Sequence, residues 1–302
     1  MIQSAHANGH FYSPVTDPDL ASRLAELYPD EPEVPGIDFN DRMHSQLLQD
    51  VLTPMLRDYD YPEHGAGDNE LSCFYTQNSQ FSWLDSRALF AFLRSWQPSR
   101  IIEVGSGNSS LLMADVNRRF LQGRTKIQCI EPFPRPFLRR GDLGLELIEK
   151  CVQAVPLAFF ASLEPNDLLF IDSSLVCKTG SDVNYLYLKL MPWLKPGVRI
   201  HIHDIRLPQE YLREWVIDEN RSWNEQYLLQ ALLIGSNMFE EVCGCAYAHY
   251  KFPDLVQKAV QHRAGRGYGG GSFYIQRVWL KCAACSVMRP AGIRDPCATP
   301  AR

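Results

Sequence analysis

The sequence has no long apolar run. No stretch approaches the roughly 18 consecutive apolar residues that a membrane-spanning helix requires. The first residues, MIQSAHANGHFYSPVTDPD, also lack the basic start and the apolar centre of a secretory signal. We therefore expect a cytoplasmic protein that has no membrane partner.

The sequence also lacks an excess of basic residues. Its formal net charge is -5 at pH 7, so Lys and Arg provide no general surplus of positive charge to neutralise phosphates. This charge disfavours a nucleic-acid partner. Apolar residues, in contrast, are not scarce. At 45% hydrophobic and 22% charged, the composition is that of a folded chain and not of a disordered one.

No disulfide framework is indicated. The nine cysteines are odd in number and scattered from Cys73 to Cys297, which suits a reducing compartment. Cys282 and Cys285 form a CxxC pair, but only Cys297 follows as a further ligand. Because a structural zinc ion takes four ligands, zinc binding at this pair is disfavoured.

What is present is an alternation of short apolar runs and helical patterns. Strands are predicted at 100–107, 125–132, 168–174, 198–205, 239–250 and 271–280. Helices are predicted at about 38–59, in the second half of 74–96, and at 109–122, 133–140 and 181–194. Strands separated by helices predict an α/β fold with a buried parallel sheet.

The same pass along the chain predicts three parts. Residues 1–70 form an N-terminal extension, rich in turns but containing one helix. Residues 71–280 form the catalytic domain. Residues 281–302 have no useful periodicity, and we expect them to be a disordered tail.

A glycine-rich turn follows the first predicted strand. Gly105 and Gly107 can take left-handed angles and allow a ligand to approach closely. Ser110 stands where a pyrophosphate-binding turn has its third glycine, which favours a cofactor without a pyrophosphate. Glu131 ends the next strand, 24 residues after Gly107, where a carboxylate can accept hydrogen bonds from both ribose hydroxyls of an adenosine.

Acidic residues and histidines gather at two later strand ends. Asp172 ends one predicted strand, and His203 and Asp204 end the next, where sheets of this kind bind their ligands. These three residues could bind a divalent metal, or His203 could act as a general base oriented by the carboxylates. Alternation along the strand places His201 on the same side as His203, where it can also be an ordinary packed histidine.

The motifs EVGSGNSS, CIEP, LLFIDSS, KTGSDVNY and LKPGVRIHIHDI together resemble the class I S-adenosylmethionine (SAM)-dependent methyltransferases of the bacterial small-molecule group. The resemblance covers about residues 70–278. It implies a Rossmann-like sheet of seven mostly parallel strands, with helices on both faces and an N-terminal helical extension. It also implies that the last strand, GSFYIQRV, is antiparallel, and that SAM is the cofactor.

The resemblance also implies site residues. Contacts to SAM are expected from Glu103, Gly105, Gly107, Asn108, Ser109, Glu131, Asp172 and Ser173. The segment FYTQNSQFSWLDSRALFAF resembles a helical segment that closes over the cofactor, with contacts expected from Tyr75, Asn78, Gln80 and Phe81. In metal-dependent relatives similar to catechol O-methyltransferase, acids match Asp172 and Asp204, but Ile205 replaces a neighbouring asparagine.

The resulting hypothesis is methyl transfer from SAM to oxygen or nitrogen of a small molecule. Transfer is an in-line displacement, so alignment of the acceptor dominates. His203 is the first candidate for the base, with Asp204 or Asp172 second. Two alternatives stay open: a SAM-fold enzyme that performs metal-dependent oxygenation or SAM cyclisation, and a non-catalytic SAM-binding module. A homo-oligomer also stays open.

Overall fold

The computed structural model describes residues 5–24, 27–30, 32–65, 73–260 and 269–279. The predicted tail at 281–302, with its CxxC pair, lies outside these residues. None of the helices in the described ranges is both long enough and apolar enough to cross a membrane.

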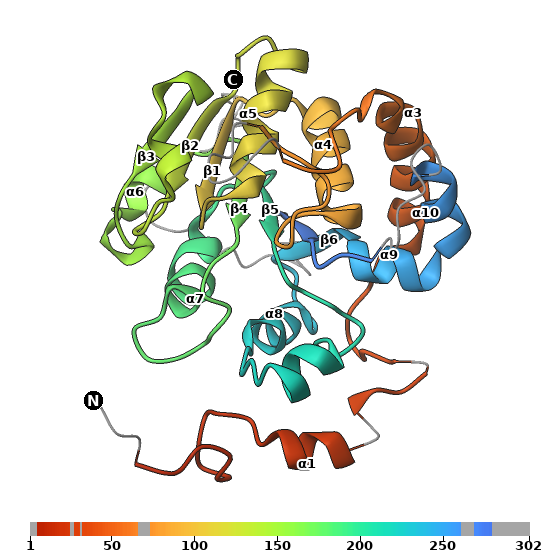
Figure 1. Ribbon diagram of the computed structural model, residues 1–302, viewed down its shortest axis with the longest axis vertical. Coiled ribbons are helices and arrows are strands. Elements are labelled where there is room, and N and C mark those ends of the chain that lie inside the picture. The colour runs from red at the N-terminus through yellow and green to blue at the C-terminus, as the bar shows by residue number, and fades with distance from the viewer. Residues whose placement is uncertain (1–4, 25–26, 31, 66–72, 261–268, 280–302) are drawn as a thin grey trace, which may run out of the picture.

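A seven-stranded sheet forms the centre of the fold (Figure 1). Its strands are β1 Arg100–Val104, β2 Lys126–Ile130, β3 Leu145–Ile148, β4 Leu168–Ile171, β5 Arg199–Ile202, β6 Phe239–Gly244 and β7 Phe273–Arg277. Their order is β3-β2-β1-β4-β5-β7-β6. Strand β7 is antiparallel to both of its neighbours, β5 and β6, and the other pairs among these strands are parallel. The predicted seven-stranded, mostly parallel α/β fold is thus confirmed.

The strand register brings the predicted site residues to one edge of the sheet. Val104 is opposite Ile130 of β2 and Ile171 of β4, and Ile171 is opposite Ile202 of β5. The residues that follow each strand therefore leave the sheet side by side. This is where the glycine turn, the ribose-binding candidate and the acidic strand ends all lie.

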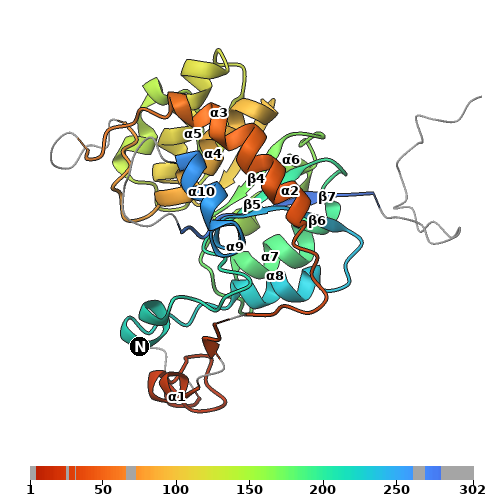
Figure 2. The same cartoon turned by 90° about the vertical axis from the view of Figure 1, so that its right-hand side faces the viewer.

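Helices cover both faces of the sheet. The α-helices are α1 Pro18–Arg23, α2 Asp41–Gln46, α3 Thr53–Met55, α4 Trp83–Trp96, α5 Asn108–Phe120, α6 Leu157–Phe160, α7 Asp182–Tyr185, α8 Glu225–Leu233, α9 Cys245–Lys251 and α10 Pro253–Val260. Wider turns at Leu47–Leu52 and Leu186–Leu190 extend α2 into α3 and lengthen α7. Figure 2 shows α10 against the segment formed by α2 and α3.

Side-chain alternation along the strands produces a core on each face. Ile101 of β1 and Phe170 of β4 belong to the core under α4 and α5, whereas Ile102 and Ile171 belong to the core under α7 and α8. Both faces of a central parallel strand are therefore apolar, as the continuous apolar runs in the sequence require.

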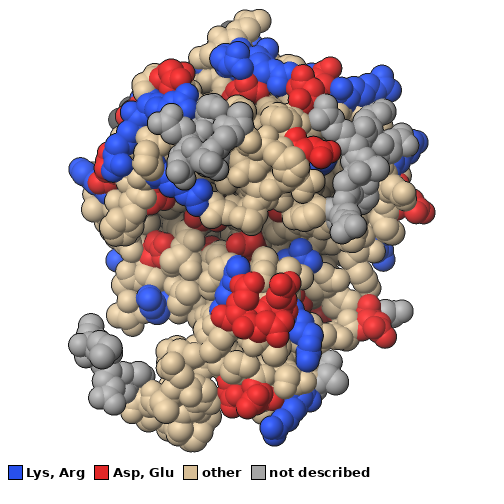
Figure 3. All heavy atoms as spheres, viewed as in Figure 1, with Lys and Arg blue, Asp and Glu red and all other residues tan. Residues whose placement is uncertain are grey.

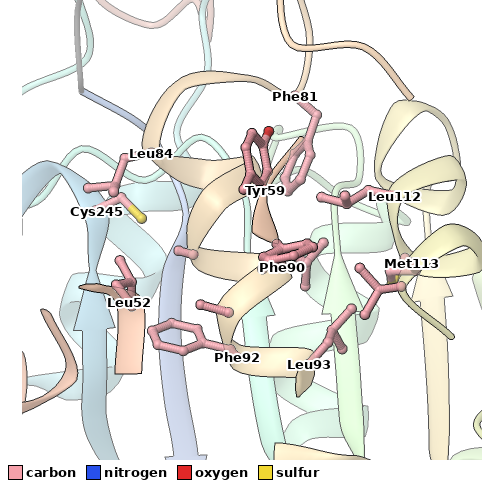
Figure 4. Close-up of a cluster of buried hydrophobic side chains, with 14 of the residues drawn as sticks. Leu52, Tyr59, Phe81, Leu84, Phe90, Phe92, Leu93, Leu112, Met113 and Cys245 are labelled. Carbon is pink, nitrogen blue, oxygen red and sulfur yellow. The ribbon is translucent and has the colours of Figure 1, made fainter. Parts of the chain in front are cut away.

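Helix α4 is buried almost all round. Every residue from Leu84 to Leu93 is buried, because the helix lies between the sheet and the N-terminal helical segment. Figure 4 shows Leu52 and Tyr59 of that segment beside Phe90 and Phe92 of α4. The N-terminal helix thus packs into the main core. A domain boundary at residue 70 stays a prediction.

The structure corrects three details of the predicted elements. Strand β3 was not expected, because it is short and half-exposed. The run 239–250 is a strand only to Gly244, where β6 reaches its last partner on β7, and the alanine-rich remainder forms α9. The range 133–140 holds only a short 3₁₀ turn at Pro136–Arg139, since two prolines precede and begin it.

Candidate functional site

The turn after β1 depends on two glycines for different reasons. Gly105 has φ of +80°, and a Cβ atom there would stand 1.7 Å from the main-chain oxygen of Asp172. Gly107 has open space where its Cβ would be, at the start of helix α5. Gly105 therefore permits close approach of two strand ends, whereas Gly107 leaves room for a ligand beside the helix N-terminus.

Glu103 lies beneath this turn and has no exposed surface. Its carboxylate accepts hydrogen bonds from the hydroxyls of Ser109 and Ser110, with Ser109 Oγ 2.6 Å away, and from the Cys129 thiol at 3.2 Å. Burial raises the pKa of Glu103 to about 7, although these donors act in the opposite direction. Glu103 and Ser109 are thus buried and hydrogen-bonded to each other within the turn, and their contact with the cofactor stays a prediction.

Glu131 follows β2 and is half-buried beside the glycine turn. Its two carboxylate oxygens accept the backbone N–H of Ser106 at 3.2 Å and of Phe133 at 2.8 Å. Each oxygen keeps a further lone pair. The carboxylate is thereby fixed at the edge of the turn and can still accept hydrogen bonds from a ligand.

The predicted helical segment 74–92 is helical only from Trp83, in α4, and its first part is a turn held by Asn78. The buried Asn78 amide donates to the carbonyls of Tyr75 and Phe81 and accepts the N–H of Phe81 at 2.6 Å. Gln80 accepts hydrogen bonds from Asn108 and Arg135, so it joins this segment to the start of α5 and to the loop after β2. Tyr75 lies farther out, half-buried near residue 65.

Three predicted residues meet at the ends of β4 and β5. His203 Nδ1 lies 3.5 Å from an oxygen of Asp172 and 3.6 Å from an oxygen of Asp204. One ligand atom from each residue falls within 4.8 Å of the others, a spacing that could hold a metal ion. Figure 3 shows a hollow across this face of the molecule, with atoms of Asp or Glu inside it.

The carboxylates dominate the electrostatics of this cluster. Burial alone would lower the pKa of His203, but Asp204 and Asp172 raise the pKa of its imidazole well above 6.5. Burial raises the pKa of Asp204 to about 6, against the attraction of His203. The cluster carries more negative than positive charge, so it is suited to attract a cation.

The comparisons with known proteins agree with this geometry. Residues 102–205, from β1 to the end of the acidic cluster, match the family described as "Methyltransferase domain". An uncharacterized protein of Archaeoglobus fulgidus is 39% identical over 165 residues, which cover 52% of this chain and 73% of the relative. Residues 102–205 therefore form a SAM-dependent methyltransferase domain of the class I fold.

Several solved structures of methyltransferases resemble this chain, although their sequence identity to it is low. A putative O-methyltransferase from Klebsiella pneumoniae is 15% identical, covers 79% of this chain and 90% of its own, and has a TM-score of 0.36. The SAH-bound methyltransferase PaMTH1 of Podospora anserina is 15% identical, covers 64% and 77% of the two chains, and has a TM-score of 0.39.

The methyltransferase carries unpartnered polar atoms around its turn. Ser106 Oγ, Asn108 Oδ1 and Ser173 Oγ are buried and have no hydrogen-bond partner within the described residues. Buried polar atoms are nearly always satisfied, so such a group marks a place for a polar ligand or water. These atoms, the room beside Gly107 and the carboxylate of Glu131 fit a polar cofactor such as SAM.

His201 on β5 and His203 just after it pack differently in the methyltransferase. His201 is fully buried, lies flat against Phe170 with ring centroids 3.8 Å apart, and contacts Ser272 Oγ at 2.8 Å. Burial lowers the pKa of His201 well below 6.5, so it is neutral. It is a packed strand histidine. Phe81 contacts the ring of His203 instead, with centroids 5.2 Å apart.

Sequence reasoning missed Asp85 of the methyltransferase as a site residue. Asp85 lies in the first turn of α4, 118 residues before His203 in the chain, and its carboxylate comes within 3.6 Å of His203 Nε2. An acid in the first turn of a helix is ordinary, so it gives no signal by itself. Gly270 and Gly271, which contact Asp85, are visible in the sequence, but the sequence alone predicts only a loop there.

Proposed function

We propose that this methyltransferase transfers the methyl group of SAM to a hydroxyl or amine of a small molecule. The observation that carries the proposal is the contact of Gly105 with Asp172, which joins the cofactor turn directly to the acidic cluster. A methyl donor at the turn and an acceptor at the cluster would then be neighbours. The chain's main task is to align the two and exclude water.

For the cofactor, we assign the ribose hydroxyls to Glu131 and the polar end of the amino-acid part to the turn. Ser106, Asn108 and Gly107 offer unpartnered polar atoms or open space there. Gln80 ties the segment before α4 to the same turn, so this segment would cover the cofactor. SAM bound in this position supplies the methyl group.

We also propose that Asp172, His203 and Asp204 hold a divalent cation. One nitrogen and two carboxylates suit manganese, iron or zinc, and magnesium with added water. A cation bound there would lower the pKa of an acceptor hydroxyl. Both ring nitrogens of His203 face carboxylates. This surrounding suits a histidine that binds a cation better than one that takes a proton from the acceptor.

The rival role for the cluster is general-base catalysis. Asp172 has the most exposed side chain of the three, at 33%, so its carboxylate can reach an acceptor proton without a cation. Chelation separates the two roles. A base mechanism survives removal of metal, whereas a cation mechanism loses activity on chelation and regains it with Mg²⁺ or Mn²⁺.

The first experiment is calorimetric titration of the chelator-treated protein with SAM and with S-adenosylhomocysteine. Glu131→Gln should weaken binding about tenfold or more, because a charge-assisted pair of hydrogen bonds is lost. Glu149→Gln is the matched control, since its exposed carboxylate pairs only with Arg139. If the folded wild type bound neither compound, with or without added cation, the cofactor assignment would be wrong.

Product analysis separates methyl transfer from different reactions of SAM. Formation of S-adenosylhomocysteine with an acceptor indicates methyl transfer, and methylthioadenosine indicates cyclisation or related chemistry. A double variant, His203→Ala with Asp204→Ala, addresses the non-catalytic module. Loss of activity in this variant with SAM binding intact would exclude a scaffold role.

A further inference from the structure

We propose that Asp85 is a positioning residue that receives the Nε2–H of His203 and thereby directs His203 Nδ1 toward Asp172 and Asp204. This inference rests on the proposed cation site and deepens it. The residue that would orient the cation ligand comes from α4, far from the strand-end motifs.

Hydrogen bonds other than the contact with His203 hold the Asp85 carboxylate in place. Its side chain is only 6% exposed, and its two oxygens accept the backbone N–H groups of Gly271 at 3.0 Å and of Ser272 at 2.7 Å. These donors belong to the chain entering β7. Two backbone hydrogen bonds therefore fix the carboxylate plane and leave the remaining lone pairs of Oδ2 for His203.

The glycines before β7 make this arrangement possible. A Cβ atom on Gly270 would lie 2.4 Å from Asp85 Oδ1, and one on Gly271 would lie 2.8 Å from the Cα atom of Asp204. The backbone there is packed directly against two acids of the site. Gly269 is different, because its Cβ would meet only Arg206 Nη1 at 3.9 Å.

His203 has no other acceptor for its second nitrogen within the described residues. Nε2 is buried without a hydrogen-bond partner, and Asp85 Oδ2 is 3.6 Å away. Contacts of this kind are often long in the unliganded protein and tighten when the site is loaded. The ring itself is confined by Phe81 on one side and by His201 along the strand.

The contact would set which nitrogen of His203 keeps its hydrogen when a cation displaces the other. A histidine that donates through one nitrogen presents a lone pair at the other, and histidines that bind metals usually donate in this way to a carboxylate or carbonyl. With Asp85 accepting from Nε2, Nδ1 is the nitrogen that gives up its hydrogen to bind a cation, and it is the atom that faces Asp172 and Asp204. Asp85 also contacts the thiol of Cys245, which offers no comparable charge.

The test uses two readouts on the full-length protein, neither of which is activity. The first is Mn²⁺ affinity, measured by electron paramagnetic resonance with SAM present. The second is the Nε2–H proton resonance of His203 in the cation-free protein, assigned with His203→Gln. We expect Asp85→Asn to weaken Mn²⁺ binding about 10-fold to 100-fold and to remove or shift the resonance.

A second pair of variants keeps the test decisive if Asp85→Asn does not fold. Gly270→Ala should displace the Asp85 carboxylate without removing its charge, and should weaken Mn²⁺ binding and shift the resonance. Gly269→Ala, its neighbour with open space, should change neither. SAM affinity, measured by calorimetry, should stay within about twofold in all folded variants, which separates positioning from general damage.

The outcomes distinguish this inference from the proposed function. If Asp85→Asn and Gly270→Ala bind Mn²⁺ as the wild type does and leave the resonance unchanged, Asp85 does not position His203. If the wild type binds SAM but not Mn²⁺, the cation assignment is wrong. The resonance then decides alone whether Asp85 orients the histidine.

Discussion

Gly105 and Asp172 are in direct backbone contact, although 67 positions separate them in the chain. Gly105 follows the strand that leads into the cofactor turn, and Asp172 begins the acidic cluster. The contact places the two halves of the site on adjacent strand ends, β1 and β4, of one rigid sheet. Neither half can move far without disturbing the other.

The two glycines of the turn should respond differently to alanine. Gly105→Ala meets both a left-handed backbone and the Asp172 carbonyl, so we expect a loss of about 3 kcal/mol or more of unfolding free energy. Gly107→Ala has open space, so its loss should be about 1 kcal/mol or less, while SAM affinity falls about tenfold or more. Urea unfolding and calorimetry measure the two effects. Equal loss of stability in both variants would contradict this assignment.

Glu103 should make the stability of the protein depend on pH. Because the folded pKa of Glu103 is raised from 4.5 to about 7, the folded state holds the proton more tightly than the unfolded chain. Its contribution is complete below pH 4.5 and is lost as the pH rises to about 7. Glu103→Gln removes this dependence, so the variant should gain about 3 kcal/mol relative to the wild type across that range.

Unfolding by urea at several pH values measures this difference. The comparison is made between variant and wild type because other groups also titrate in this range. Glu146→Gln serves as a control, since Glu146 is half-exposed and pairs with Lys126. Parallel stability curves for Glu103→Gln and the wild type would show that the buried carboxyl does not titrate as its surroundings indicate.

Local patterns in the sequence predicted the parts of the site that lie at strand ends. Apolar runs that end in glycine or an acid are visible without the fold, and they located Glu131, Asp172 and His203 at one edge of the sheet. Asp85 could not be found in this way, because it reaches His203 only through the packing of α4 against the start of β7. No local spacing encodes that contact.

The same distinction applies to the fold. The buried central strands are continuous apolar runs and could be predicted, whereas the edge strand β3 needs few apolar residues and gives a weak pattern. Residues after Gly244 alternate weakly and resemble a strand. They form a helix because β7 offers no further partner at that point.

Asn78 should be more important than its place in a loop indicates. Its buried amide satisfies backbone groups of the segment before α4, which Gln80 links to the start of α5. We expect Asn78→Ala to cost about 2–4 kcal/mol of unfolding free energy and to weaken SAM binding. Gln77→Ala, on the exposed side of the same turn, should be nearly neutral in thermal unfolding and in calorimetry. A neutral Asn78→Ala would show that this segment is not held by the amide.

Glu225 supplies the strongest pH prediction. It begins α8 and has no exposed surface. Burial raises the pKa of Glu225 from 4.5 to about 8. The Tyr187 hydroxyl opposes this rise, and the carboxylates of Asp182, Asp172 and Asp204 add to it. The side chain is therefore mainly neutral at pH 7.

Glutamine resembles the neutral acid in shape, so Glu225→Gln should fold as the wild type does near pH 5. In the wild type, the folded state binds the proton of Glu225 more tightly than the unfolded chain does. As the pH rises from 4.5 toward 8, the stability gained from this difference is lost, whereas the variant has no such proton to lose. The difference should reach up to about 5 kcal/mol above pH 8. Glu240→Gln, an exposed residue on β6, should show no such divergence in urea unfolding. A variant that is less stable than the wild type at pH 9 would mean that Glu225 is ionised in the folded protein and that its carboxylate stabilises the fold.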